Sequence, residues 1–144
     1  MKKDIIIFGA MAGMIGNVAK LVVAFILYYL GLINKTYIHI AGGYFESKGL
    51  ENFLVLLNAV INDFFYAAFL GVLIYLVLKL TDMKYIKIKG LLFGGFIHLI
   101  NNGILIFGDL NKISIDEQTS FLLLVPTLIF GLSVCWFIEK NTYS

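Results

Sequence analysis

The stretch GAMAGMIGNVAK, residues 9–20, decides how the first helix of this chain packs. Its glycines recur at intervals of three and four: Gly9, Gly13 and Gly16. Lys20 and Ala24 continue the same row, and Asn17 flanks it. Because residues at these intervals share one face of an α-helix, this face is small along its length and has an ammonium near its middle. Small residues let helices approach closely in a membrane, so we expect the face to contact protein rather than lipid.

The composition places the whole chain in the membrane-protein class. Of its 144 residues, 60% are hydrophobic and only 14% are charged. A soluble domain of this size has fewer hydrophobic and more charged residues. All 11 basic residues are lysines, so nucleic-acid binding has almost no support. The single cysteine, Cys135, excludes an intramolecular disulfide and is expected to serve as a small apolar residue.

Four apolar segments are long enough to cross a membrane as helices, and none has the period-two alternation of a barrel strand. They cover residues 5–33, 53–80, 90–108 and 120–138. We therefore predict an all-α, polytopic protein in which 1–144 form one four-helix transmembrane domain. Pro126 in the last segment predicts a kink that Thr127 or a neighbouring helix accommodates.

The lysines predict the orientation. The two chain ends and the connection between the second and third segments, which lie on one side of the membrane, hold seven lysines: Lys2, Lys3, Lys79, Lys84, Lys87, Lys89 and Lys140. The opposite connections hold Lys35, Lys48 and Lys112 together with Glu46, Glu51, Asp109, Asp116 and Glu117. The positive-inside rule then places both termini in the cytoplasm. Low arginine with abundant lysine, isoleucine and asparagine favours an AT-rich bacterial genome, and hence a bacterial plasma membrane.

The 34–52 connection is unusual because its centre, YIHIAGGYF, is too apolar for a solvated loop. This composition favours a segment that lies in the membrane interface or folds back over the outer face of the bundle. We expect His39 within it to be an interfacial residue rather than a ligand.

Two further helices carry rows of small residues interrupted by polar ones. The second helix has a row at steps of four: Ala59, Asp63, Ala67 and Gly71. The adjoining row holds Asn58, Asn62 and Tyr66. The third helix has a similar row, with Asn101 alongside: Gly90, Gly94, His98 and Asn102. Both small rows are therefore expected to face protein, like that of the first helix.

The depth of the polar residues suggests one site. At about 1.5 Å per residue, Lys20 and Asp63 lie about 13 and 15 Å below the outer boundary, and Asn101 and Asn102 about 17 Å above the inner one. Each lone charge there costs about 2.5 to 3.5 kcal/mol on insertion scales. We hypothesise that Lys20 and Asp63 form an intramembrane ion pair, or a neutral pair after proton transfer, and that His98 and the asparagines complete the network. Alternatively, one polar face bonds within the protomer and another across an oligomer interface.

Plainer interpretations exist for most of these residues. Rows of glycine more often serve close helix packing than line a transport pathway. A buried asparagine often forms only an interhelical hydrogen bond worth about 0.6 kcal/mol. His98 alone favours a hydrogen-bonded core histidine over a metal ligand. Lys20 and Asp63 resist such an explanation, because a structural protein could use leucine at both positions.

Residues 9–20 and 90–101 align with glycines at the first and fifth positions, Asn17 against His98 and Lys20 against Asn101. Two parallel helical hairpins would produce this pattern, and the interface of such repeats often houses a site at the middle of the membrane. The alternative is shared glycine packing without duplication.

No catalytic signature is present. The chain lacks a P-loop, HExxH, GxSxG and a deep pair of carboxylates, so we expect no enzyme activity, no cofactor and no metal. An acid–base pair of Asp63 and His98 is the only enzymatic alternative that the residues leave open.

The layout resembles the YqhR-like small, uncharacterised membrane proteins of spore-forming bacteria. The likeness rests on a glycine-rich first helix, GAMAGMIG to YYLGL, on the semi-apolar outer connection, on the small-residue second helix, and on KIKGLLFGG opening the third. It covers nearly the whole chain and implies an architecture without a settled activity.

Two functional classes follow. In the first, an oligomeric small transporter or channel exposes Lys20, Asp63 and the asparagines to water and carries a small cation or a proton. In the second, a structural or regulatory membrane subunit keeps the charges dry and docks another membrane protein through its glycine faces. The expected partners are the lipid bilayer and either further copies of the chain or another membrane protein.

Overall fold

A computed structural model of the chain describes residues 4–43, 52–107 and 115–142, with the side chains of 104–107 excepted. Its elements are α1 (Ile5–Tyr29), α2 (Tyr37–Gly43), α3 (Phe53–Thr81), α4 (Ile86–Phe107), α5 (Glu117–Leu122) and α6 (Leu124–Thr142). Every regular element in these ranges is a helix, which confirms the all-α prediction. The predicted end of the third segment at Gly108 lies outside the described residues, as do Lys2, Lys3, Lys48 and Lys112.

Three helical segments are long and apolar enough to cross a membrane: Ile5–Tyr29, Phe53–Thr81 and the combined α5–α6 segment Glu117–Thr142. This supports the membrane-protein class. The first predicted segment was too long, because α1 stops before Gly31, whose φ of +70° is the left-handed conformation that commonly ends helices. The last predicted segment, 120–138, lies in two helices that meet at Leu123.

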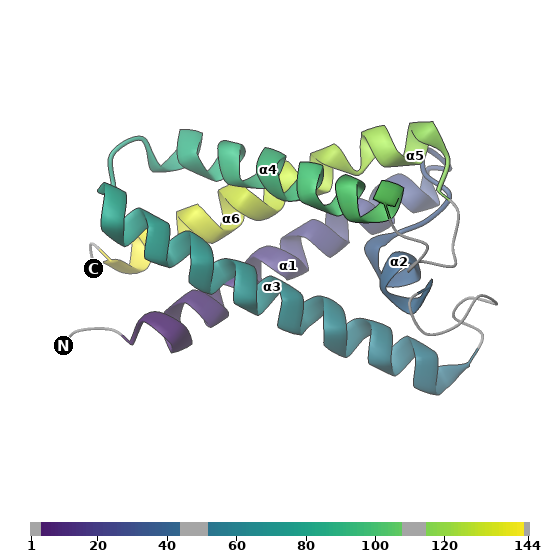
Figure 1. The fold of residues 1–144 in the computed structure, drawn as a ribbon, viewed down its shortest axis with the longest axis horizontal. Helices are drawn as coiled ribbons and strands as arrows, with labels where there is room; N and C mark the ends of the chain where they lie inside the picture. Colours follow the sequence, from purple (N-terminus) through teal and green to yellow (C-terminus); the bar gives the residue numbers. More distant parts are fainter. Residues whose placement is uncertain (1–3, 44–51, 108–114, 143–144) are drawn as a thin grey trace.

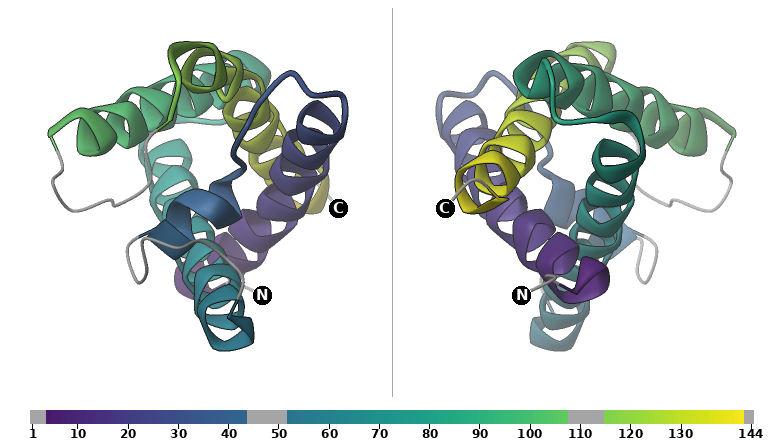
Figure 2. Two further views of the ribbon diagram at one scale, coloured as in Figure 1. Left: turned by 90° about the vertical axis from the view of Figure 1, so that its right-hand side faces the viewer. Right: turned by 90° about the vertical axis from the view of Figure 1, so that its left-hand side faces the viewer.

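The long helices form an open ring (Figure 1, Figure 2). α1 packs against both α3 and α6, and α6 packs against α4. α3 and α4 are joined by residues 82–85 and diverge from this turn toward the end of the bundle where α2 lies. The start of α1 and the end of α6 lie at the same end as the α3–α4 turn (Figure 1).

Glycines set the closest approaches in this ring. A Cβ added to Gly71 on α3 would overlap the backbone of Gly9 and Gly13 on α1, and one added to Gly131 on α6 would overlap that of Gly90 and Gly94 on α4. The two crossings therefore bring backbone directly against backbone. Gly16 faces α6 instead, where a Cβ would lie 2.5 Å from Val134 Cγ2. Ala59 and Ala67 are fully buried on α3.

Two apolar clusters fill the core. The larger joins Phe8 to Tyr75, Leu78 and Ile138 near the α3–α4 turn, and the rings of Phe8 and Tyr75 meet edge to face with centroids 5.0 Å apart. The smaller, around Tyr37 and Ile40, lies at the opposite end. Along α1, Asn17 and Lys20 fall between Ala12 of the first cluster and Ala24 of the second. The polar residues thus lie between two apolar layers.

α2 accounts for the apolar centre of the 34–52 connection. It contacts α3 and lies inside the ring at its wider end (Figure 2, left). Its residues Tyr37, Ile38 and Ile40 are buried. This short helix therefore folds back into the bundle rather than over its outer face. His39 is half-buried beside Thr36, whose hydroxyl lies 2.8 Å from Nδ1 of His39. Burial, together with the nearby Lys35, holds the pKa of His39 below its usual value.

The glycine crossings generate a stability prediction. Gly71→Ala and Gly131→Ala should each lower the free energy of unfolding in detergent by about 1 to 3 kcal/mol, because the added methyl overpacks a backbone contact. Gly95→Ala is the matched control, since a Cβ at Gly95 on α4 would meet nothing within 4 Å. Equal stability of all three variants in a denaturant titration would contradict the packing assigned here.

Candidate functional site

A buried ion pair joins α1 to α3. Lys20 Nζ lies 2.8 Å from Asp63 Oδ1, and the two side chains are exposed by only 7% and 6%. The close crossing of α1 and α3 brings these two side chains together, because Gly13 of α1 lies against the backbone of Ala67 of α3. One helical turn from this contact, Asn17 on α1 faces Asp63 on α3.

Asn17 donates a hydrogen bond to the second carboxylate oxygen of Asp63, but its own amide oxygen has no hydrogen-bond partner among the described residues. Its Nδ2 donates to Asp63 Oδ2 over 2.8 Å. Its Oδ1 is buried and has no hydrogen-bond partner among the described residues. Flipping the amide would set Oδ1 against the carboxylate, so the ion pair fixes this orientation. A buried acceptor without a donor costs about 1 to 3 kcal/mol, so this oxygen is the least satisfied polar atom that the described part of the site contains.

Tyr37 of α2 covers the ammonium. Lys20 Nζ lies 4.4 Å from the centroid of the Tyr37 ring, within the range of a cation–π interaction. The Tyr37 hydroxyl donates to the carbonyl of Leu123 over 2.6 Å. That carbonyl lies where α5 meets α6, and it also accepts from the Thr127 hydroxyl over 3.4 Å. The Tyr37 side chain thus connects the Lys20–Asp63 ion pair to the junction of α5 and α6.

His98 and Asn102 form a second polar group on α4. Asn102 Nδ2 lies 2.8 Å from His98 Nε2, and Ser120 of α5 donates to Asn102 Oδ1 over 3.1 Å. Asn101 bonds elsewhere, accepting from the Tyr66 hydroxyl of α3 over 2.8 Å. The sequence suggested a single polar network, but in the structure its residues belong to separate groups.

The division has a geometric cause. Gly90 and Gly94 lie against α6, and His98 and Asn102 continue the same row of α4 at steps of four. Packing of the glycines on α6 therefore turns His98 and Asn102 toward α5 and α6. Asn101, on the adjoining row, is the member of the pair that reaches α3.

Asn58 and Asn62 lie outside both groups. They are exposed on α3, and Asn62 Nδ2 donates back to the carbonyl of Asn58 over 2.7 Å. The sequence placed them beside Asp63, but one residue along a helix turns a side chain by about 100°, which carries Asn62 off the Asp63 face.

Tyr37 was not singled out from the sequence, although its ring contacts the ammonium of Lys20. The only hint was the apolar character of the connection that contains it. Ser120 was also missed, because hydroxyl residues near a span end have no distinctive pattern.

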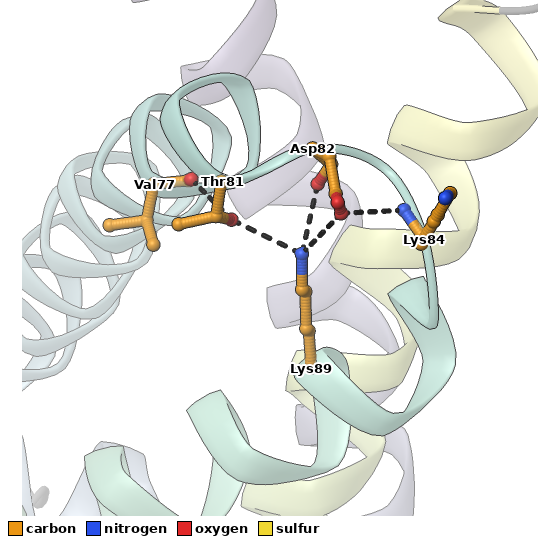
Figure 3. Close-up of polar contacts among 5 residues, drawn as sticks. All are labelled: Val77, Thr81, Asp82, Lys84 and Lys89. Carbon is orange, nitrogen blue, oxygen red and sulfur yellow. Dashed lines mark hydrogen bonds and ion pairs between the residues drawn. The ribbon is translucent and has the colours of Figure 1, made fainter.

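A second ion pair offers a contrast (Figure 3). Lys89 Nζ lies 3.0 Å from Asp82 Oδ1 in the α3–α4 turn, and it also contacts the Thr81 hydroxyl and the Asp82 carbonyl. This pair is open to solvent, with Asp82 58% exposed. The hydrogen bond from Lys89 and that from the Lys84 backbone hold the pKa of Asp82 below its usual value. Such exposed pairs contribute little to stability.

The chemistry available to the buried site is limited. It offers one carboxylate, one ammonium, one amide oxygen without a partner and one aromatic face. Among the described residues, no group of three or more His, Cys, Asp or Glu side chains could hold a metal ion. The site is suited to binding or moving a single positive charge.

Comparisons of the chain with protein-family models, curated proteins and solved structures find no match. The likeness to the YqhR-like proteins stays a prediction.

The buried pair predicts strong coupling between its partners. Asp63→Leu alone should lower the free energy of unfolding by about 3 to 5 kcal/mol, because it leaves the ammonium of Lys20 buried without a counter-ion. Lys20→Met combined with Asp63→Leu should restore most of this loss. Asp82→Ala, which breaks the exposed pair, is the control and should change little. Additive effects of the two buried substitutions in a double-mutant cycle would contradict the pairing.

The two contacts of Tyr37 can be separated. Tyr37→Phe removes only the hydrogen bond to Leu123 and should cost about 1 kcal/mol of unfolding free energy. Tyr37→Leu also removes the aromatic face over Lys20 and should cost more. Tyr85→Phe alters an exposed tyrosine and serves as the control. If Phe and Leu at position 37 are equally stable in the same denaturant titration, the ring does not stabilise the ammonium.

Proposed function

We propose that this chain is a small membrane transporter or channel for a small cation or a proton, with Lys20 and Asp63 at its central site. The observation that carries the proposal is the buried Oδ1 of Asn17, an acceptor without a donor beside a charged pair. A buried acceptor of this kind calls for a partner, and a bound cation would supply one.

The proposed topology has four spans: α1, α3, α4 and the α5–α6 segment. The α3–α4 turn, the helix ends that flank it and the end of α6 hold Lys79, Lys84, Lys87, Lys89 and Lys140. Since the start of α1 lies at this same end, the positive-inside rule supports cytoplasmic termini in a bacterial plasma membrane (Figure 1). Lys20 and Asp63 then lie near the middle of the membrane, where unpaired charges are expensive and commonly functional.

A duplication of two hairpins is part of the proposal. Gly71 of α3 lies against Gly9 and Gly13 of α1, and Gly131 of α6 lies against Gly90 and Gly94 of α4. The two contacts involve the glycines that align between 9–20 and 90–101, which supports a common origin. Repeats of this kind often place a site at their interface.

Assembly into a homo-oligomer or with another membrane protein is also proposed. Asn58 and Asn62 expose amides on α3 next to apolar residues such as Ile61 and Phe65. Lipid offers no hydrogen bonds to these amides, whereas a neighbouring helix does.

A structural or regulatory subunit is the second candidate, favoured by the low exposure of the ion pair. The glycine faces that such a subunit would use contact other helices of the same chain. A partner would have to dock elsewhere, and this weakens the second candidate relative to the first.

Reconstitution into liposomes tests the proposal. Wild-type protein should carry at least one of H⁺, Na⁺ and K⁺, measured with fluorescent indicators inside the liposomes. Lys20→Met combined with Asp63→Leu should assemble like the wild type in gel filtration, yet its flux should fall to that of empty liposomes, because the charged site is gone. Asp82→Asn is the control and should retain its flux.

Two results would overturn the proposal. The first is the absence of flux of any tested ion through correctly assembled wild-type protein, which would leave the subunit role. The second is normal flux through the double variant, which would remove the charged site from the pathway.

A further inference from the structure

We infer that two copies of this chain pair through α3, in parallel about a two-fold axis along the membrane normal, so that the Asn62 amides of the two copies bond to each other. This inference rests on the assembly that is part of the proposed function, and it names the partner and the surface that the partner covers.

One side of α3 carries exposed residues at intervals of four, three and four: Asn58, Asn62, Phe65 and Phe69. The side chains of Phe65 and Phe69 are 74% and 60% exposed. The helices of the same chain therefore leave this side of α3 uncovered. Intervals of four and three repeat every seven residues, which is the spacing at which parallel helices pack along each other in a coiled coil.

Asn62 lies at a depth that water does not reach. α3 has 29 residues and is about 43 Å long, whereas the hydrocarbon core is about 30 Å thick. A centred helix then extends about 7 Å beyond the core at each end. Asn62 lies about 14 Å from the start of α3, and hence within the core, and Asn58 lies at its edge. Lipid tails offer no hydrogen bond to an amide at the depth of Asn62.

The amide of Asn62 has hydrogen-bonding capacity left. One of its N–H groups donates to the carbonyl of Asn58 over 2.7 Å. Its other N–H group and its Oδ1 have no partner among the described residues. The amide can therefore donate one hydrogen bond and accept another at the same time. Asparagine bonds of this kind join neighbouring helices in membranes.

These properties favour a second copy of the chain over an unrelated partner. Copies that follow the positive-inside rule share one orientation, so a two-fold axis relating two of them runs along the membrane normal. Each residue near the axis then faces its own counterpart at the same depth. An amide suits its counterpart because it both donates and accepts, whereas a charged side chain would repel its counterpart. A different protein would have to present a polar group at the depth of Asn62.

Cysteine cross-linking in the membrane tests the surface. Two cysteines form a disulfide only when their Cα atoms come within about 7 Å. Asn62→Cys should therefore give a cross-linked dimer on oxidation with copper phenanthroline. Leu99→Cys is the matched control, since Leu99 is 68% exposed on α4, and it should stay monomeric. The wild type should also stay monomeric, because its Cys135 is buried.

Substitutions at position 62 test the amide itself. Asn62→Leu removes the hydrogen bonds at an exposed position, so the monomer should fold while dimerisation weakens by at least about tenfold. Asn62→Gln retains an amide and should dimerise to within about threefold of the wild type. The measurement is energy transfer between fluorescent labels at the carboxyl termini of two populations mixed in liposomes, over a range of protein-to-lipid ratios.

Three results would overturn the inference while any flux leaves the transporter standing. They are a monomeric wild type at every protein-to-lipid ratio, equal cross-linking of Leu99→Cys and Asn62→Cys, and equal dimerisation of Asn62→Leu and the wild type. Cross-linking of Asn62→Cys only to a different membrane protein would overturn it as well. A dimer joined at Asn62 that carries none of the tested ions would leave the inference standing and overturn the proposed function.

Discussion

Direct contact between the backbones of α1 and α3 is the constraint on which the rest of this structure depends. Only glycine permits it at Gly9, Gly13 and Gly71, where any side chain would overlap a neighbouring main chain. With the helices this close, a lysine and an aspartate one or two turns away can meet without leaving the interior. Larger residues at the crossing would separate α1 from α3, and the cost of the buried charges would no longer be offset by their pairing.

The sequence was sufficient for the parts of the fold that depend on helical periodicity. Rows at steps of four identified the faces of α1 and α3 that bear Lys20 and Asp63, and hence the pair itself. The same rule placed Gly90 and Gly94 on one face with His98. It could not say which helix that face meets, because periodicity gives direction around a helix axis and carries no information about the neighbour. The contact of His98 with Asn102 follows the predicted row, but the next partner of this group is Ser120 of α5 rather than the Lys20–Asp63 pair.

Two other features escaped prediction for a different reason. The burial of α2 and the break at Leu123 both depend on contacts between segments far apart in the chain. Tyr37 bonds to Leu123 across 86 positions, and Thr119 bonds to Asn34 across 85. Neither partner has local character that reveals the other. Pro126 indicated only that the last helix would be irregular, and the irregularity lies three residues earlier, at Leu123, whose carbonyl accepts from the hydroxyls of Tyr37 and Thr127.

The contacts that hold the long helices together differ from those that hold α2. At both glycine crossings, backbone meets backbone directly. Around α2, the elements are joined by the apolar cluster of Tyr37 and Ile40 and by hydrogen bonds such as those of Tyr37 and Thr119, each worth about 1 kcal/mol. Since the Tyr37 ring lies over the ammonium, access to Lys20 from the side of α2 requires this ring to leave the ammonium and the Tyr37 hydroxyl to give up its bond to Leu123.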